Sequence, residues 1–427
     1  MTDATIPLRT ADLDRGVQMR NRVVDDLIAD GTIVSGPVEA VMRKVPREMF
    51  APELPMEEIY HPSNGAVTKR DAHGNAVSSL SAPQVQAYML EQAHIEPGMN
   101  VLEVGSGGMN AAYLLELVGP SGRVTTVDID PFVTERAARL LEEAGYSRAN
   151  VVLADAEGGV PEYAPYDRIL ITVGASDIPS AWVDQLADGG RLVVPLEMRG
   201  QSRTIAFDKA DGHLVSYSAR LFGFVPMQGA GAREATLFVM RGGEVTLRFD
   251  EKTDVDPRRL EHVFDNPRVE VWSGATIGRT EPWATAHMWL ATTLPGFCRV
   301  VVDKSKTTGL ISPPGSHTAA PAVVGSDCLA YVTTRGVAES SVVEFGVHAF
   351  GPHAGELAEH VAEQLRVWAR EHRGGPGPTV YVHPAGTPDD ALPSGRVVDK
   401  PHCRITISWP GTASAAAGQG ALHDPDQ

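Results

Sequence analysis

The alternation of strand patterns and helix patterns between residues 84 and 196 constrains the fold more than any other feature of this chain. Its most informative piece is "VLEVGSGGMNAAYLLELVG" (101–119), in which an apolar run enters a glycine turn and an apolar helix pattern leaves it. A repeated strand–helix order of this kind predicts a mainly parallel, doubly wound α/β sheet with helices on both faces, a Rossmann-like fold. The expected strands are 100–104, 123–129, 150–155, 168–174 and 190–196, and the expected helices are 84–94, 110–118, 131–144 and 180–187.

The length of 427 residues suggests two domains, at roughly 100–200 residues each. The alternation stops near residue 235, so we expect a first domain over 1–235 and a smaller α+β domain over 236–410. Residues 411–427 are small and polar, which predicts a disordered tail. The second domain is expected to hold strands at "EVTLRFD", "CRVVVD", "TVYVHP" and "RITISW", and a helix over 355–372 with Leu357, Val361, Leu365 and Trp368 on one stripe.

The N-terminal part, residues 13–50, is expected to be helical. One helix places apolar side chains on one face and ends at "ADG", and a second, short helix begins at Pro37. Prolines in "VPREMFAPELP" then break the pattern. The apolar face of the first helix is predicted to consist of Val23, Val24, Leu27 and Ile28.

Composition excludes several classes of function. A formal charge of −17 argues against a nucleic-acid partner, because a phosphate backbone is bound through an excess of Lys and Arg. Cys298, Cys328 and Cys403 lie far apart without a CxxC pattern, so we expect three buried thiols and no zinc site. The sequence shows no signal core and no apolar run near the ~20 residues that span a bilayer, which predicts a soluble, cytoplasmic protein without a membrane partner.

The glycine turn at Gly105, Ser106 and Gly107 is the first candidate site, because glycine lets a ligand touch the backbone at the carboxyl end of a sheet. A purely structural tight turn is the alternative. The next strand ends in Asp128, about twenty residues on, where a carboxylate can accept both ribose hydroxyls of an adenosine ligand. Asp128 could instead cap the following helix, although Asp130 suits that role better.

Asp155 ends the third strand beside the same crevice, where it could accept from an adenine amino group or be an ordinary surface residue. We include Ile129 and Ala156, which follow the two acids, among the candidate cofactor-binding residues. The third glycine of a dinucleotide fingerprint is replaced by Asn110, so the pattern at Glu103, Gly105 and Gly107 suits S-adenosyl-L-methionine better than a nicotinamide cofactor. Glu103 is expected to act near the methionine amine, through backbone or water, or to be a plain strand-end carboxylate.

Several ordered blocks over residues 15–230 resemble the protein-L-isoaspartate O-methyltransferases. This resemblance implies the Rossmann-like fold of class I S-adenosylmethionine-dependent methyltransferases, and methylation of the carboxylate of isoaspartate in damaged proteins. The blocks are "VPREMF" (45–50), "SSLSAP" (78–83), "VLEVGSGG" (101–108), "EYAPYDRILITVGASDIPSAWVDQLADGGRLVVPL" (162–196) and "FVPM" (224–227).

By position in this resemblance, Ser81 matches the family's active-site serine and Ser79 its nearby threonine, and Val173 falls in the substrate set. The resemblance implies that the two serines hydrogen-bond the substrate carboxylate and orient one of its oxygens toward the methyl group. Ser81 could also simply cap the helix that opens at "AP". No catalytic pair is required, since a carboxylate with a pKa near 4 is already a nucleophile at neutral pH. We expect no metal; His348, His353 and His360 are interpreted as scattered surface and loop residues.

Three departures from the family stand out. Met109 replaces the last glycine of the loop. Residues 60–77 form a longer link, with "DAHGNA" as a hairpin turn and with Lys69 and Arg70 either meeting a substrate carboxylate or solvated. About 190 residues follow the catalytic domain, and these are interpreted as a unit that frames the peptide or, alternatively, serves dimerisation or stability.

These departures, with "VTKRD", "SSLSAP", "VLEVGSGGMNAA" and "VTTVDIDP", resemble a branch of the family associated with ribosomally made peptides such as lanthipeptides, graspetides and lasso peptides. The branch implies methylation of an aspartate in a macrocyclic precursor, leading to succinimide or isoaspartate. The leading hypothesis is therefore a peptide-tailoring carboxyl methyltransferase, and the alternative is isoaspartyl repair. A non-catalytic binding module and a nicotinamide dehydrogenase are the remaining rivals; the sequence leaves the peptide and the oligomeric state open.

Overall fold

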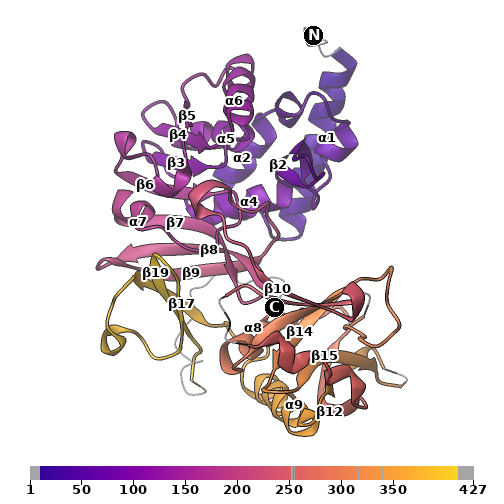
Figure 1. Cartoon of the computed structure of the whole chain (residues 1–427). Helices are drawn as coiled ribbons and strands as arrows, with labels where there is room; N and C mark the ends of the chain where they lie inside the picture. Colours follow the sequence, from indigo (N-terminus) through magenta and orange to yellow (C-terminus); the bar gives the residue numbers. More distant parts are fainter. Residues whose placement is uncertain (1–9, 252, 254, 316, 339, 412–427) are drawn as a thin grey trace.

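The computed structural model describes residues 10–251, 253, 255–315, 317–338 and 340–411. Two lobes are built on two large sheets, one of ten strands and one of seven, and a separate two-stranded hairpin lies on the first lobe (Figure 1). The first lobe carries the glycine turn, so its sheet sets the candidate site.

The ten-stranded sheet has the order β18-β19-β17-β9-β8-β7-β6-β3-β4-β5. Its parallel half confirms the strand–helix alternation predicted from the sequence, and β8 and β9 extend it antiparallel. The strands of this part are β3 (Asn100–Val104), β4 (Arg123–Asp128), β5 (Asn150–Leu153), β6 (Tyr166–Ile171), β7 (Leu186–Met198), β8 (Gln201–Ala210) and β9 (His213–Leu221).

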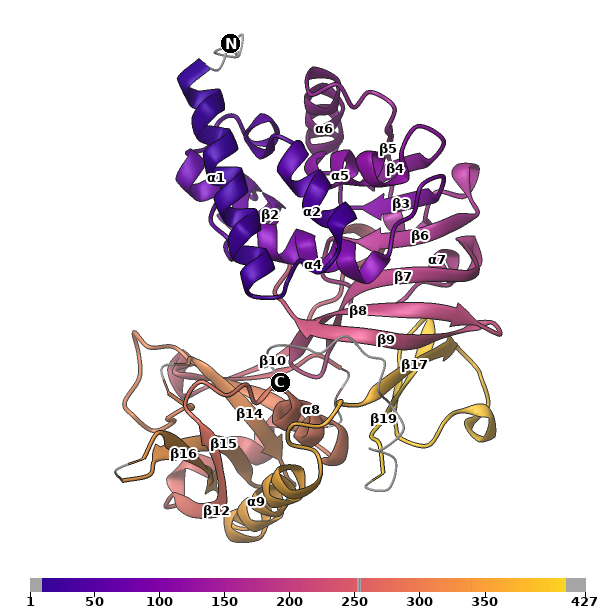
Figure 2. The ribbon, with the colours of Figure 1, turned by 180° about the vertical axis from the view of Figure 1, so that it is seen from behind.

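Helices cover both faces of this sheet, as the doubly wound pattern predicts. One face packs against the larger helical layer, which Figure 2 shows from behind, and the other packs against a short helix whose Trp182 is fully buried. Ile28 was expected on the buried face of the first helix, but it is 38% exposed because the helix turns that side chain toward solvent. The helical layer comprises α1 (Thr10–Ala29), α2 (Gly36–Lys44), α3 (Met56–Ile59), α4 (Pro83–Ala93), α5 (Met109–Val118) and α6 (Pro131–Glu143); the short helix is α7 (Ser180–Gln185).

The last three strands of the first sheet come from the far end of the chain. Strands β17 (Thr379–Pro384), β18 (Arg396–Asp399) and β19 (Cys403–Ser408) pair antiparallel, and β17 adds to β9. These residues were expected in the second domain, whereas their hydrogen bonds join them to the first sheet. The boundary at 235 stays a prediction, and the predicted tail lies outside the described residues apart from Gly411.

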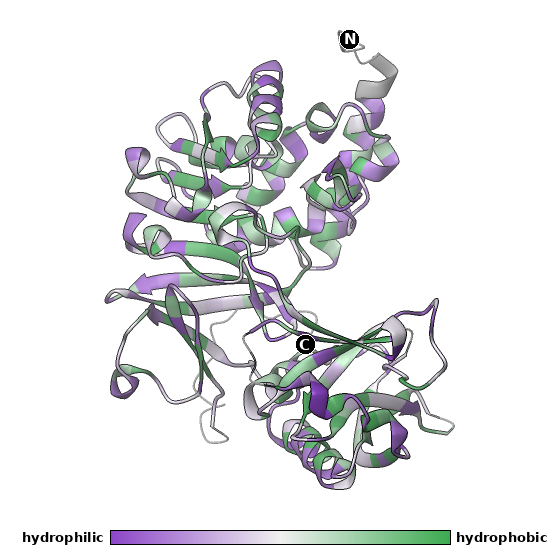
Figure 3. Cartoon of the chain, viewed as in Figure 1, coloured by the Kyte–Doolittle hydropathy of each residue, from purple (hydrophilic) through white to green (hydrophobic). Residues whose placement is uncertain are grey.

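The second lobe is an antiparallel sheet with helices, as expected for an α+β unit. Its order is β10-β11-β13-β14-β15-β16-β12, and two helices pack on one face of it. Hydropathy follows this plan, with apolar residues along the strands and hydrophilic residues on outer helix faces (Figure 3). The elements are β10 (Thr236–Met240), β11 (Val245–Phe249), β12 (Val269–Gly278), α8 (Ala284–Thr293), β13 (Phe297–Val302), β14 (Ala319–Val324), β15 (Leu329–Gly336), β16 (Val342–Phe350) and α9 (Ala354–Glu371).

Two predictions on polar and sulfur side chains have different outcomes. All three cysteines are buried and free, as expected. The placement of His348 at the surface is wrong: it is 7% exposed inside β16, where its Nδ1 lies 2.9 Å from the Tyr331 hydroxyl. Among the described residues, no group of His, Cys, Asp and Glu could hold a metal ion, and no helix is long and apolar enough to cross a membrane.

The expected turn at "DAHGNA" closes a hairpin of β1 (Ala66–Arg70) and β2 (Ala76–Leu80). The Asp71 N–H donates to the Asn75 carbonyl at 2.9 Å, and the Gly74 N–H donates to the Asp71 carbonyl at 3.0 Å. The hairpin ends one residue before Ser81, so it delivers the serine segment directly to the start of α4.

Candidate active site

The glycine turn lines a cavity at the carboxyl ends of β3, β4 and β6. Gly105 has φ +99°, and a Cβ added there would lie 2.4 Å from the Thr172 hydroxyl oxygen. That hydroxyl donates to the Val104 carbonyl at 2.9 Å. Gly105 is therefore required by both its backbone conformation and its close neighbour.

The other two residues of the turn leave room for a ligand. A Cβ added at Gly107 would meet only the Ser79 carbonyl oxygen, 4.0 Å away. The Ser106 hydroxyl is buried and has no partner within the described part of the chain. An open backbone face beside an unsatisfied buried hydroxyl is what a ligand held against the main chain needs.

Asp128 and Asp130 have different roles, as the sequence favours: Asp130 caps a helix and Asp128 contacts the glycine turn. The Asp130 carboxylate caps α6 by accepting from the Phe132 N–H at 3.0 Å. Asp128 accepts from the Ser106 N–H at 3.0 Å and from the Asp130 N–H at 3.0 Å, and burial raises its pKa. Ile129, between them, is 37% exposed. The Asp128 carboxylate is thus tied to the glycine turn rather than to the helix.

Glu103 lies behind the glycine turn, 1% exposed. The Thr126 hydroxyl donates to its Oε2 at 2.8 Å, and the Asn110 side chain also bonds to it. Burial is the largest effect on this carboxyl and raises its pKa to about 7, with the Asp128 charge adding to the rise and the two hydrogen bonds opposing it. Glu103 is therefore a buried carboxyl whose charge changes near neutral pH.

Asp155 is placed differently from the residues that line the cavity. Its Oδ1 accepts from the Glu157 N–H at 3.0 Å, which starts the 3-10 turn η2 (Ala156–Gly158), and its Oδ2 accepts from the Ala230 N–H at 2.8 Å. The Ala156 carbonyl accepts from the Trp182 indole at 2.7 Å. Both oxygens of Asp155 are thus engaged by backbone, although each retains a lone pair.

Ser79 and Ser81 both line the cavity, opposite the glycine turn. The N-cap of α4 is Ala82, without a side-chain cap bond, so the alternative that Ser81 is only a helix cap is wrong. The Ser81 hydroxyl makes no hydrogen bond within the described residues, which leaves it free to donate to a ligand.

Buried Arg47 holds the main chain of this serine. Its guanidinium donates to the Ser81 carbonyl and the Gln86 side chain, and its Nε donates to the Ile59 carbonyl at 2.6 Å. Arg47 is 2% exposed, so the contact is shielded from water. The segment "VPREMF" thereby fixes the beginning of α4.

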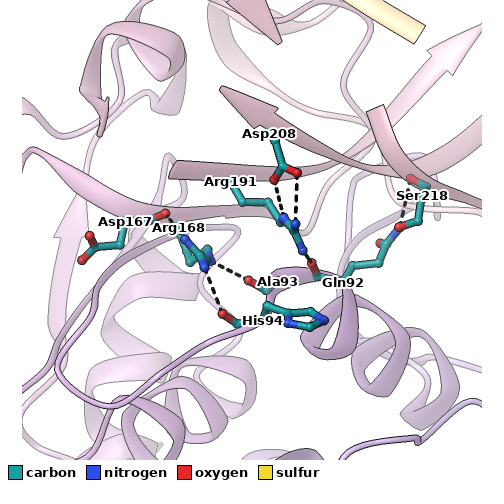
Figure 4. A network of polar contacts seen from close by, with 8 residues as sticks. All are labelled: Gln92, Ala93, His94, Asp167, Arg168, Arg191, Asp208 and Ser218. Carbon is teal, nitrogen blue, oxygen red and sulfur yellow. Dashed lines mark hydrogen bonds and ion pairs between the residues drawn. The ribbon is translucent and has the colours of Figure 1, made fainter. Parts of the chain in front are cut away.

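The other end of α4 is fixed by two arginines from the sheet (Figure 4). Arg168 donates to the carbonyls of Ala93 and His94, at 2.6 and 3.1 Å. Arg191 donates to the Gln92 carbonyl at 2.9 Å and pairs with Asp208. Cations at the last carbonyls of a helix satisfy those acceptors and interact favourably with the negative end of the helix dipole. Helix α4 is thus held at both ends, and Ser81 with it.

The basic residues of the hairpin have partners within the chain. The Lys69 ammonium pairs with Asp130 and lies 5.2 Å from the Phe132 ring centroid, whereas Arg70 donates to the Gly74 carbonyl at 2.9 Å in the turn. Burial acts to raise the pKa of Asp130, but Lys69 and the Phe132 N–H outweigh it, so that pKa is lowered. Lys69 therefore fastens the hairpin to α6 beside Asp128.

One cavity brings together eight of the predicted site residues. Ile129, Asp155, Ala156, Lys69 and Arg70 do not line it. Thr126 and Thr172 were not predicted from the sequence; each is a threonine near the carboxyl end of a parallel strand, Thr126 within β4 and Thr172 directly after β6. The eight lining residues are Ser79, Ser81, Glu103, Gly105, Ser106, Gly107, Asp128 and Val173.

Comparisons with known proteins identify a family for this chain. The family model for protein-L-isoaspartate(D-aspartate) O-methyltransferase matches residues 18–232. A protein-L-isoaspartate O-methyltransferase of Hyperthermus butylicus is 39% identical over 222 residues, which are 50% of this chain and 89% of that protein.

Two solved structures are also similar. A protein-L-isoaspartate O-methyltransferase has a TM-score of 0.48 at 21% identity, with coverage of 85% of this chain and 96% of that one. A β-aspartate methyltransferase from Plasmodium falciparum, in complex with S-adenosyl-L-homocysteine, has a TM-score of 0.43 at 17% identity, with coverage of 49% and 98%.

The family uses S-adenosyl-L-methionine, and the open face of Gly107, the unpartnered Ser106 hydroxyl and the Asp128 carboxylate fit that cofactor. The chain therefore belongs to the protein-L-isoaspartate(D-aspartate) O-methyltransferase family and is an S-adenosyl-L-methionine-dependent carboxyl O-methyltransferase.

Proposed function

We propose that this chain methylates the free carboxylate of isoaspartyl residues in peptides and proteins, the reaction named for its relatives. The observation that carries the proposal is the shared cavity, in which the Ser79–Ser81 segment faces the glycine turn and Asp128. A carboxylate held by the serines would lie beside the cofactor's place in the same enclosure.

The residues around the cavity can support this reaction without a general base. A carboxylate is already ionised at neutral pH, and the cofactor supplies an activated methyl group on sulfur. The Ser81 hydroxyl would donate to one carboxylate oxygen and leave the other free to attack. Alignment and exclusion of water are then the main contributions of the protein. The ester product can close to a succinimide when the neighbouring amide nitrogen displaces methanol.

We assign the remaining predicted residues to parts of the cofactor from their positions around the glycine turn. Asp128 and Ile129 would face the ribose, and Asp155 and Ala156 would border the adenine. Glu103, behind the turn, would lie near the methionine amine, where a cation favours its charged form. Val173, which lines the cavity, would lie on the substrate side.

The test is mass spectrometry of methyl transfer to an isoaspartyl peptide and to the same peptide with a normal aspartyl linkage. We expect methyl gain on the isoaspartyl peptide alone. Ser81→Ala should lower kcat/KM by about ten- to a hundredfold, as the loss of one donor to a reacting oxygen does. Ser81→Thr keeps the hydroxyl and should recover most of the activity. Equal methylation of both peptides would reject the proposed selectivity.

A second candidate is methylation of an aspartate in a constrained, ribosomally made peptide, the branch that the sequence resembles. The hairpin β1–β2 favours it, because Val77, the last residue of the longer link, lines the cavity next to Ser78 and Ser79 of the family's own segment. A macrocyclic aspartyl peptide added to the same assay separates the two. Methyl gain followed by loss of methanol on the macrocycle alone would replace the repair proposal with this one.

A further inference from the structure

A turn from the far end of the chain reaches the catalytic lobe next to the site. Residues 400–403 connect β18 and β19, and the turn is closed by the Lys400 N–H donating to the Cys403 carbonyl at 2.9 Å. These residues lie far beyond the part of the chain that matches the family model, 18–232. Any role they have in the reaction is therefore added to the family's own machinery.

The first contact of this turn is with Asp177, which is 7% exposed. The His402 N–H donates to its Oδ2 at 3.0 Å, and the Cys403 thiol donates to its Oδ1 at 3.1 Å. Asp177 follows the segment Val173–Ala175, where the Gly174 N–H and carbonyl bond to Val225 and Met227. The turn thus holds the loop that continues from Val173, a residue that lines the cavity.

The second contact is with Glu157, in the turn η2. The His402 Nε2 lies 2.9 Å from the Glu157 Oε1, and both side chains are partly buried, at 32% and 20% exposure. The Glu157 N–H donates to Asp155, whose other oxygen accepts from Ala230. His402 therefore contacts the turn η2, which holds one of the two carboxylate oxygens of Asp155.

We propose that His402 and Cys403 are positioning residues for the cofactor, which join the Asp155 turn to the Asp177 loop beside the cavity; the inference rests on the proposed place of the adenine next to Asp155. Neither residue lines the cavity. Each acts through a carboxylate of the catalytic lobe, Glu157 for the imidazole and Asp177 for the thiol and the main chain. The C-terminal strands thus contribute to cofactor affinity in addition to extending the sheet.

The test is calorimetric binding of S-adenosyl-L-homocysteine to the full chain carrying His402→Ala, Glu157→Ala or both. Each single variant should raise Kd about three- to fivefold, the effect of one partly screened ion pair, with kcat within about twofold at saturating cofactor. The double variant should be no weaker than the worse single variant, since both remove the same pair. His402→Gln, which can still donate to Glu157, should recover most of the affinity.

Arg404→Ala is the matched control. Arg404 is two residues from His402, but it pairs with Asp399 and Asp389 of the C-terminal segment itself. This variant should keep the wild-type Kd. Unchanged Kd in the His402 and Glu157 variants would overturn the proposal, and so would an equal rise in Arg404→Ala or a fall in melting temperature without a change in Kd. Because the probe is S-adenosyl-L-homocysteine alone, a wrong peptide substrate would not alter the outcome.

Discussion

Glu103 gives this chain a stability that should fall with rising pH in the neutral range. Burial raises its pKa to about 7 in the folded chain, against an ordinary value of 4.5. The folded state then binds the proton more tightly than the unfolded state. The contribution to stability is fully present below the unfolded pKa and is lost as pH rises through the folded pKa. For these two values the loss amounts to about 2 kcal/mol between about pH 5.5 and about pH 8.

Glu103→Gln removes this titration and keeps the shape of the side chain. Urea unfolding of the ligand-free protein should therefore show a wild-type free energy of unfolding that falls by about 2 kcal/mol between about pH 5.5 and about pH 8, relative to the variant. Asp303→Asn is the control: its hydrogen bonds with Ser305 lower the Asp303 pKa, so its titration lies below this pH range. If the difference between wild type and Glu103→Gln were the same at both pH values, the assigned burial effect would be wrong.

Three further substitutions test the site. Asp128→Asn should raise the Kd of S-adenosyl-L-homocysteine about tenfold in calorimetry, because a neutral amide is a weaker acceptor for ribose hydroxyls; an unchanged Kd would remove Asp128 from the cofactor site. Lys69→Met loses the ion pair with Asp130 and should raise the peptide KM about threefold without changing cofactor affinity, and a change in both would contradict a role confined to the hairpin. Arg47→Met leaves the Ser81 carbonyl without its donor and should lower both kcat and the free energy of unfolding, the latter by about 3 kcal/mol in urea titrations; full stability would refute its structural role.

The sequence predicted the parallel half of the fold because its elements are local. Each strand from β3 to β7 is an apolar run bounded by turn residues, and α5 and α6 follow with helical periodicity. The division of work between Asp128 and Asp130 was also visible, since Pro131 opens a helix and the residue before it is the natural cap. These features depend on neighbours within a few residues of one another.

What the sequence could not show depends on pairing over long distances. Strand β17 joins β9 through Tyr381 and Val382, more than 160 residues from their partners, and nothing in either segment encodes that choice. The partner of Lys69 is Asp130, 61 residues away, so the sequence left Lys69 open between solvent and substrate. Ser81 was ambiguous for the same reason, because only the structure shows that Ala82 occupies the cap position.

The chemistry of carboxyl methylation leaves selectivity to the walls of the cavity. The attacking carboxylate needs no base, so activation of the nucleophile adds little to the rate. The rate depends instead on how the protein positions the carboxylate. In the proposed arrangement the place of the carboxylate is bounded by the β1–β2 hairpin and the start of α4, whereas the adjoining loops are held by a turn at residues 400–403. Changes in the hairpin should therefore alter KM for the peptide, and changes in the distant turn should alter affinity for the cofactor. Such a separation would let peptide selectivity and cofactor affinity change independently of each other, without a change in the catalytic residues.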